Sequence, residues 1–241
     1  MFKRDKNPKI EFIALNENHK FIFDPPVPAS TMLPEWYKKQ NKTIGNKYDV
    51  SSVTGNVART IKACMPVFDI IAAGYFIKMP AEAMFHYDAG QIKTGWSIDG
   101  WTVIDVHNRE QYNQFSVPDG YSSYNAFKFN NPWIIKTPPG YSTLFIQPSL
   151  RDPQPFYMVP AIVDTDKHPS PINFPFFLKE GFEGSIPFGE PIIQAIPFKR
   201  EEWSSLVSCQ DPNEEQKQWQ RAKRQINNRY KDFFRSPKVW K

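Results

Sequence analysis

The sequence predicts a mostly β protein, an antiparallel sandwich or jelly-roll-like single domain with an irregular proline-rich N-terminal arm and a C-terminal amphipathic α-helix. Three observations lead to this fold class. The 241 residues include 23 prolines and only 11 glycines, and proline interrupts helices and central strands. Roughly ten short apolar segments alternate with turn residues, a spacing typical of sandwiches and barrels. The long stretch of helical periodicity lies at the C-terminus.

Residues 1–56 are predicted to form an extended arm. Asp24–Pro28 has a polyproline-like sequence, and Leu33–Lys39 has the pattern of one amphipathic turn. Large apolar side chains of the arm need a surface to cover them, on the same domain or on a partner, among them Phe12, Ile13, Phe21, Phe23, Trp36 and Tyr37.

Residues 57–207 are predicted to form the β-rich domain. Apolar residues between 60 and 74 recur at helical spacing, which predicts a short helix with Pro66 at its first position and Gly74 as its stop signal. Strands are expected over residues 75–80, 83–87, 91–96, 101–106, 132–137, 141–147, 156–164, 172–178 and 192–198.

Turn sequences separate these strands. Asp88–Gly90 and Asp99–Gly100 are typical of hairpins. Pro138–Gly140 is expected to return the chain antiparallel, so that the strand over 141–147 pairs with the one before it. Phe188–Glu190 marks a further turn.

Residues 208–241 are predicted to form a basic amphipathic helix. Asp211–Glu214 supplies an N-cap residue, a proline at the first position and a capping-box acid. Three uses of the helix are compatible with its pattern. It packs its aromatic stripe on the sheet, it docks the stripe on a partner subunit with its basic face on an acidic surface or phosphate, or it lies on a membrane surface. The residues expected to carry a partner contact are Trp219, Arg221, Arg224, Ile226, Tyr230 and Phe233.

Charge is distributed unevenly along the chain. The net charge is +5, but residues 217–241 hold nine Lys or Arg and one acid, so this segment carries +8 and the remainder −3. The basic pI of about 9.0 therefore describes one segment and does not indicate general nucleic-acid binding. Trp36–Lys39 interleaves aromatics with bases, as in single-strand binders, but an acidic body makes nucleic acid an improbable partner.

Other classes of protein are excluded by simple features. No stretch approaches the roughly 20 apolar residues that span a bilayer, and the N-terminus lacks the apolar region of a secretory signal. Cys64 and Cys209 are far apart, so they indicate two reduced, largely buried thiols of an intracellular protein rather than a disulfide framework or a zinc site.

His86 and Asp88 form an HxD pattern at the end of an expected strand. Alternate strand residues share a face, so both can reach one metal ion, and His168 is the candidate third ligand of a non-haem iron site. The alternative is a hairpin end with an ordinary surface histidine, because Asp88 also begins a good turn. No metal is assigned on this pattern alone.

Asp164 and Asp166 flank a threonine at the end of the strand expected over 156–164. Two carboxylates at this spacing hold Mg²⁺ or polarise a water molecule in some enzymes. The structural alternative is that both accept backbone hydrogen bonds in the turn before Pro169.

Several segments together resemble a family of uncharacterised proteins encoded by T4-like tailed phages of marine bacteria, and more distantly a bacterial domain family of unknown function. The segments are Asn131–Ser142, Ile162–Asp166, Ile172–Phe176, Gly189–Gln194 and Ile196–Glu201. The resemblance covers about residues 58–241. It implies a phage origin, synthesis in the host cytoplasm and, as one alternative, a place in the virion, but no established activity.

Gly74–Tyr75 before a strand, then Ile162–Asp166 and then the segment Gly189–Gln194 follow one another along the chain. This order of elements is similar to that of the dUTPase and dCTP-deaminase superfamily. This resemblance implies a nucleotide-directed activity in which Asp164 is the base, Asp166 is the second acid and Gln194 is a structural or phosphate-side residue, with Mg²⁺ as cofactor. The sequence departs from that pattern, since His168 stands where a tyrosine is expected and the Ser-Gly phosphate motif is missing.

Two classes of function therefore remain open. The first is a non-enzymatic phage structural or interaction module without a cofactor, whose arm and tail helix contact its own copies or other phage structural proteins. The second is an enzyme or ligand-binding module, either nucleotide-directed or metal-dependent. Serine-nucleophile, Walker and dinucleotide patterns are absent from the sequence, which favours the first.

Overall fold

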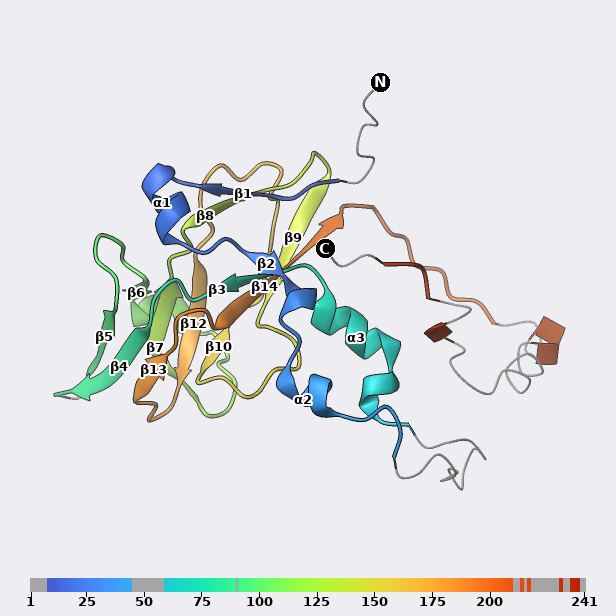
Figure 1. Cartoon of the computed structure of the whole chain (residues 1–241), viewed down its shortest axis with the longest axis horizontal. Helices are drawn as coiled ribbons and strands as arrows, with labels where there is room; N and C mark the ends of the chain where they lie inside the picture. The colour runs from blue at the N-terminus through green and yellow to red at the C-terminus, as the bar shows by residue number, and fades with distance from the viewer. Residues whose placement is uncertain are drawn as a thin grey trace. The chain divides into compact units, whose positions relative to one another are not determined.

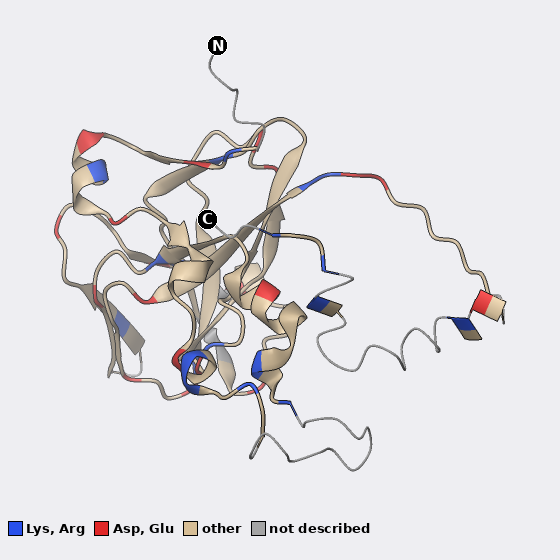
Figure 2. Cartoon of the chain, turned by 45° about the vertical axis from the view of Figure 1, so that its right-hand side comes forward, with Lys and Arg blue, Asp and Glu red and all other residues tan. Residues whose placement is uncertain are grey.

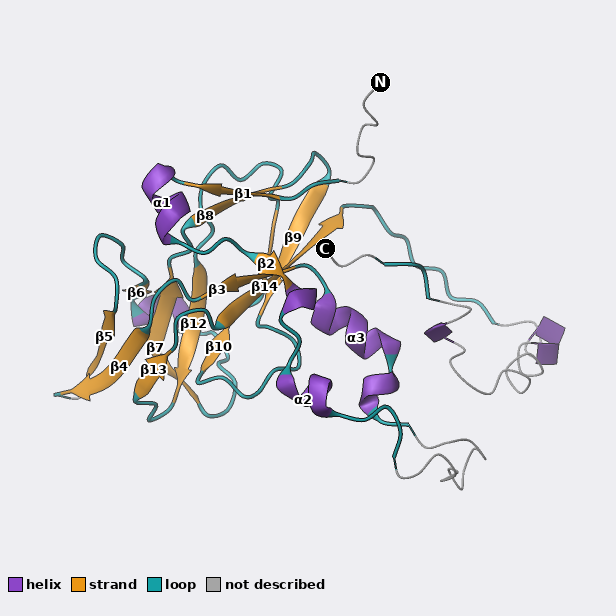
Figure 3. Cartoon of the chain, in the orientation of Figure 1, coloured by secondary structure: helices purple, strands orange, loops and turns teal. Residues whose placement is uncertain are grey.

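The computed structural model describes residues 8–44, 59–89, 91–209, 213, 214, 216, 217, 230, 231 and 235–238. The chain divides into two compact units. The first comprises residues 1–32 and 73–200, and the second comprises residues 33–72 and 201–241. The first unit is built from antiparallel strands with few helices, so the predicted fold class is confirmed (Figures 1 and 3).

The strands of the first unit form four antiparallel sheets. One is the pair β1 (Glu11–Ala14) and β8 (Trp133–Lys136). The second has the order β10 (Phe156–Met158), β12 (Phe174–Lys179), β7 (Tyr121–Phe129) and β6 (Ile104–Val106). The third has the order β11 (Ala161–Val163), β9 (Tyr141–Ile146), β14 (Pro191–Lys199), β3 (Tyr75–Lys78) and β2 (Val27–Pro28). The fourth has the order β13 (Gly184–Ile186), β4 (Ala83–Asp88) and β5 (Gln91–Trp96). Helix α1 (Glu17–Ile22) and the 3₁₀ turns η1 (Ala29–Thr31) and η3 (Arg109–Tyr112) belong to the same unit.

Phenylalanine fills the core of the first unit, which explains why the chain contains 20 of them. The seven that are almost completely buried are Phe76, Phe85, Phe129, Phe145, Phe156, Phe174 and Phe177. Burial alternates along β4, where Ala83 and Phe85 point inward and Met84 and His86 outward. One face of each such strand therefore builds the core and the other meets solvent.

The second unit contains α2 (Glu35–Lys39), η2 (Ile61–Ala63) and α3 (Met65–Ala72). The helix predicted after residue 60 is confirmed, and Pro66 lies in its first turn, where a backbone N–H has no intrahelical acceptor. Gly74 follows the helix with a φ of +67°. The unit continues from Glu201 to Cys209 as a segment without helix or strand.

The N-terminal segment is less irregular than the sequence indicates. Strand β1 pairs with β8 and strand β2 pairs with β3. The surface that covers β1 and β2 is therefore the protein's own β unit, and Phe23 is buried in that unit. Tyr37, which belongs to the second unit, is also buried.

Three details of the predicted strand arrangement are wrong. Strand β8 does not pair with β9 but with β1, and β9 lies between β11 and β14. Asp99–Gly100 joins strands of different sheets instead of closing a hairpin. The single strand expected over 156–164 is split into β10 and β11, because Pro160 has no N–H to donate to a ladder.

Candidate functional site

The ends of three strands bring the predicted acidic pair next to an arginine. Asp164 and Asp166 follow β11, Ser142 lies on β9, and Arg200 directly follows β14. Lys199 pairs with Tyr141 at the same edge of the five-stranded sheet, and the Arg200 N–H donates to the carbonyl of Gly140 at 2.8 Å. Residues distant in sequence therefore meet at one edge of this sheet.

Arg200 binds Asp166 with both terminal nitrogens. Its Nη1 donates to Asp166 Oδ1 at 2.9 Å, and its Nη2 donates to Oδ2. The Gly140 N–H donates to Asp166 Oδ2 at 2.9 Å. The Asp166 side chain is only 7% exposed, so both carboxylate oxygens are engaged inside the protein.

Asp164 is the more open member of the pair. Its Oδ1 accepts from Ser142 Oγ at 2.7 Å and lies 3.2 Å from Arg200 Nη1, while its side chain is 50% exposed. Arg200 Nη1 also donates to Ser142 Oγ at 2.9 Å. Asp164 is therefore the carboxylate of this cluster that solvent reaches.

Three buried threonines continue the network beneath the acids. The Oγ1 of Thr165 lies 2.7 Å from that of Thr137 and 2.9 Å from that of Thr143. Thr137 Oγ1 donates to the carbonyl of Tyr141 at 3.3 Å. Because the polar groups satisfy one another, the network holds together the ends of β8, β9 and β11.

The hydrogen bond from Arg200 lowers the pKa of Asp166 to about 2, against the opposing effect of burial, and the Gly140 N–H lowers the pKa further. A general base acts best when its pKa is near the working pH. With a pKa of about 2, Asp166 is ionised at neutral pH, and its bidentate contact orients the Arg200 guanidinium.

The Asp166→Asn variant is expected to be less stable than the wild type at pH 7, with a difference that shrinks in acid. The folded pKa of about 2 lies below the unfolded value of about 3.9. The ionised group therefore stabilises the fold fully above about pH 4, and this contribution is lost as the pH falls towards 2. Thermal unfolding midpoints of both proteins between pH 7 and pH 2 check this. Asp119→Asn, at an exposed position, is the control, and a pH-independent difference for Asp166→Asn would contradict the assignment.

Gln194 is not part of this cluster. It pairs with Ile146 on β9, four residues from Ser142, which is about 13 Å along the strand. Its buried side chain accepts from the Ser149 N–H at 3.0 Å and donates to the carbonyl of Ala73 at 2.8 Å. The structure thus brings Asp164 and Asp166 together with Arg200. Gln194 lies outside this cluster and links the backbone at Ser149 to the backbone at Ala73.

The three candidate metal ligands do not form a site. His86 and Asp88 lie on exposed positions of β4, in the three-stranded sheet. His168 follows β11 of the five-stranded sheet, and its Nδ1 lies 2.8 Å from the carbonyl oxygen of Ser170. Within the described residues, no group of three His, Cys, Asp or Glu side chains is placed to hold a metal ion. The three candidate ligands are therefore not brought together, since His86 and Asp88 lie in the three-stranded sheet and His168 follows a strand of the five-stranded sheet.

Asp69 is a buried charge that the sequence analysis missed. It lies in α3, and it accepts from Arg235 Nη2 at 2.7 Å and from Lys238 Nζ at 2.6 Å. These partners, with the Arg235 hydrogen bond contributing most, lower its pKa to about 2. An acid inside the apolar helix sequence MPVFDIIA was the available signal. The contact ties residues 235–238 to α3 within the second unit.

Five of the six tail-helix residues expected to contact a partner lie outside the described part of the chain. These are Trp219, Arg221, Arg224, Ile226 and Phe233. Tyr230 is described and is 44% exposed. Asn213, Glu214, Gln216 and Lys217 are helical, and the Lys217 ammonium pairs with Glu214 at 2.9 Å.

The segment Glu201–Cys209, called the exposed arm below, is a second feature that the sequence analysis missed. All nine of its residues are exposed. Its three large apolar side chains are among the most exposed in the described chain: Trp203 at 88%, Leu206 at 89% and Val207 at 97%. Acidic residues occur only at its start, and the rest carries no charge (Figure 2). Both cysteines are free thiols, but neither is fully buried: Cys64 is half-buried, and Cys209 lies on this arm and is exposed.

No helix in the described part of the chain has the length and apolar character needed to cross a membrane. Comparisons with protein-family models, with curated proteins and with solved structures each find no match.

Proposed function

We propose that the chain is a non-enzymatic structural or protein-interaction module encoded by a phage, with a place in the virion, which binds its own copies or other phage structural proteins. The phage assignment is supported by the resemblance of segments such as Asn131–Ser142 and Gly189–Gln194. The interaction role is supported by the exposed arm and by the basic tail that follows it.

The exposed arm is the observation that carries this proposal. Burying one side chain such as Trp203, Leu206 or Val207 stabilises a protein or a complex by about 1.5–3 kcal/mol. Within five residues the arm presents all three to solvent at 88–97% exposure. Clustered apolar residues of this kind mark sites of protein contact, so the arm has the properties of a segment that a partner covers.

The cluster around Arg200 supports the same function. Arg200 is the last residue before the exposed arm, and its guanidinium is held by Asp166, Ser142 and the carbonyl of Tyr141. These hydrogen bonds fix the position of Arg200, so the exposed arm starts next to a rigidly held residue. Asp166, one of the two acids weighed as catalytic, thus has a structural use beside the start of the arm.

The association state of the purified protein tests the proposal. The full chain is expected to form a complex with itself, measured as molar mass by light scattering over a dilution series. Deleting Asp211–Lys241 is expected to weaken association at least about tenfold, the effect of losing 1.4 kcal/mol of contact. Asp164→Asn is the matched control, because it removes the carboxylate that a nucleotide hydrolase would need. This variant should associate like the wild type.

Two further measurements make the outcome decisive. The deletion removes the partners of Asp69, so it is repeated with Asp69→Asn, which leaves no unpaired buried charge in α3. Hydrolysis of dUTP and dCTP is assayed with Mg²⁺. Turnover that Asp164→Asn abolishes would overturn the proposal in favour of a nucleotide hydrolase, and unchanged association of the truncated chain would remove the tail from it.

A further inference from the structure

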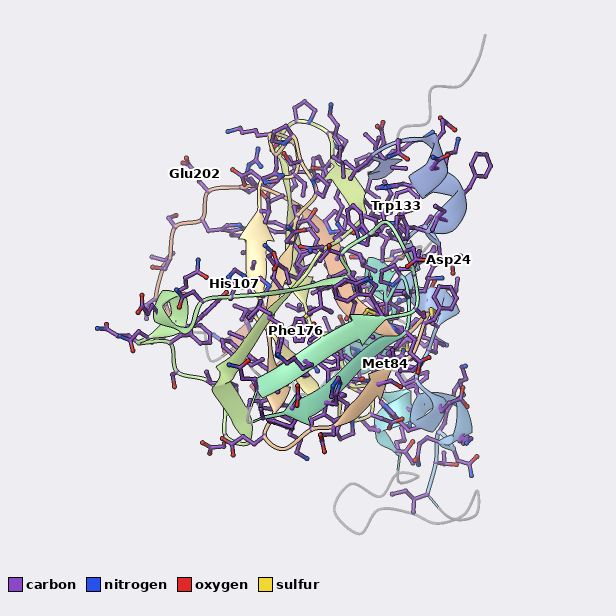
Figure 4. All side chains as sticks on the ribbon, turned by 90° about the vertical axis from the view of Figure 1, so that its left-hand side faces the viewer. Asp24, Met84, His107, Trp133, Phe176 and Glu202 are labelled. Carbon is purple, nitrogen blue, oxygen red and sulfur yellow. The ribbon has the colours of Figure 1, made fainter. Side chains whose placement is uncertain are left out.

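A groove of about 720 Å³ lies beside β1 in the first unit. Its walls come from β1, from α1, from the segment after α1 and from β8, and Trp133 lies beside α1 in the side-chain view (Figure 4). The lining residues are Phe12, Ile13, Ala14, Asn16, Glu17, Lys20, Pro25 and Trp133. Five of the eight are apolar, as is usual for a site that takes apolar side chains.

Apolar side chains surround this groove as well as line it. Ile13 is 40% exposed and Leu15, the next outward residue after β1, is 43% exposed. On α1, Phe21 is 83% exposed and Ile22 is 52% exposed. The β1–α1 region therefore exposes four large apolar side chains within ten residues, and clustered exposure of this kind marks interaction sites.

Strand β1 also has an open edge. It belongs to a two-stranded sheet and pairs only with β8 among the described residues. A strand edge presents backbone N–H and C=O groups that accept an extended segment from another chain. The groove thus offers both an apolar pocket and a backbone template.

The exposed arm has the complementary properties. It has neither helix nor strand over nine residues, and beyond Glu202 it carries no charge up to Cys209. Trp203, Leu206 and Val207 supply large apolar side chains for a pocket. A segment of this length can add to a strand of four residues and still place its side chains in the groove.

We propose that the exposed arm of one copy docks in the β1–α1 groove of a second copy, and that the exchange is reciprocal. This inference rests on the proposed function and names its partner. Each chain has one arm and one groove. In a closed two-fold dimer, the arm of each copy therefore occupies the groove of the other. Nine arm residues and eight groove residues per copy approach the roughly 20–30 residues per side of a standard interface.

A mixing experiment with two variants tests the exchange. The arm variant carries Trp203→Ser, Leu206→Ser and Val207→Ser, and keeps its groove. The groove variant carries Ile13→Glu, and keeps its arm. Each variant alone is expected to be monomeric by sedimentation velocity, whereas their equimolar mixture is expected to form a dimer through one intact arm and groove. Ser205→Ala on the arm and Ile162→Ser on β11, which is 64% exposed, are controls that should dimerise like the wild type.

The outcomes separate this inference from the proposed function. Dimers that persist in both variants would overturn the arm–groove contact and leave self-association standing. A wild type that stays monomeric would overturn both the arm–groove exchange and the self-association that the proposed function includes. Variants that are monomeric alone and in the mixture would overturn reciprocal exchange.

A cross-link keeps the test independent of the folding of the groove variant. Cys209 is an exposed thiol at the end of the arm, and Lys20→Cys places a second thiol in the groove wall, with Cys64→Ser removing the remaining one. Mild oxidation is expected to give a covalent dimer on a non-reducing gel, and the Cys64→Ser protein that keeps Lys20 is expected to give none. A cross-linked monomer would show instead that the arm folds into the groove of its own chain, and would overturn the proposal.

Discussion

Replacing Gly74 with alanine is expected to lower the free energy of unfolding by about 3 kcal/mol or more. Gly74 has a φ of +67°, and an added Cβ would lie 2.0 Å from the carbonyl oxygen of Ala195, on the backbone of β14. The left-handed conformation costs about 1–2 kcal/mol for a residue with a Cβ, and overpacking adds typically 1–3 kcal/mol. Relief of the clash would require β14 to move away from β3, with which Ala195 pairs.

Urea denaturation of the purified variant measures this loss. Gly120→Ala is the matched control, because Gly120 has a φ of +81° and no atom within 4 Å of the added Cβ. It should lose only the conformational cost of about 1–2 kcal/mol. Equal losses for the two variants would show that the close approach of Gly74 to β14 is not a constraint on the fold.

Replacing Phe176 with alanine is expected to destabilise the β unit by about 3–5 kcal/mol. The Phe176 ring lies 5.6 Å from that of Phe127, 6.1 Å from that of Phe156 and 6.5 Å from that of Phe85, measured between centroids. It is only 2% exposed and lies within the strands of the first unit (Figure 4). Truncation would also enlarge a small apolar cavity that Phe176 already lines, so the lost contacts are not easily recovered.

Thermal unfolding provides the measurement. A loss of this size lowers the midpoint by roughly 6–20 °C, since each kcal/mol shifts a protein of this length by about 2–4 °C. Phe188→Ala is the control, because that ring is 56% exposed and surface substitutions usually change stability by less than about 0.5 kcal/mol. Similar midpoints for both variants would argue against an aromatic core built around Phe176.

Local sequence predicted many elements but not all of their partners. Short apolar runs bounded by turn residues identified β3, β4, β5 and β9 to within a residue or two. Strand β7 was missed, since its first half, Tyr121–Asn125, is mostly polar and it becomes a strand through pairing with β12 and β6. Turn sequences also suggested that β8 returns to β9, whereas the partner is β1, about 120 residues earlier. Pairing depends on which distant segments pack together, and no local pattern records that.

At the candidate site too, the sequence predicted individual residues but not their distant partners. The acidic pair Asp164 and Asp166 was visible in the sequence, but Arg200, the distant residue that pairs with Asp166 and lowers its pKa, was not. The sequence of the exposed arm did not show that Trp203, Leu206 and Val207 are solvent-exposed, because exposure depends on how the whole chain folds. The ion pairs of Asp69 likewise depend on Arg235 and Lys238, which lie about 170 residues later in the sequence.

The sequence by itself determined that this is a mostly β, antiparallel protein with a short helix after residue 60, because turn residues and strand periodicity act over a few neighbouring residues. Only the tertiary structure decided which strands pair, which acids are held by cations and which apolar residues are left uncovered. Those outcomes arise from contacts between residues far apart in the chain, whose free energies depend on burial and geometry that a linear pattern does not contain.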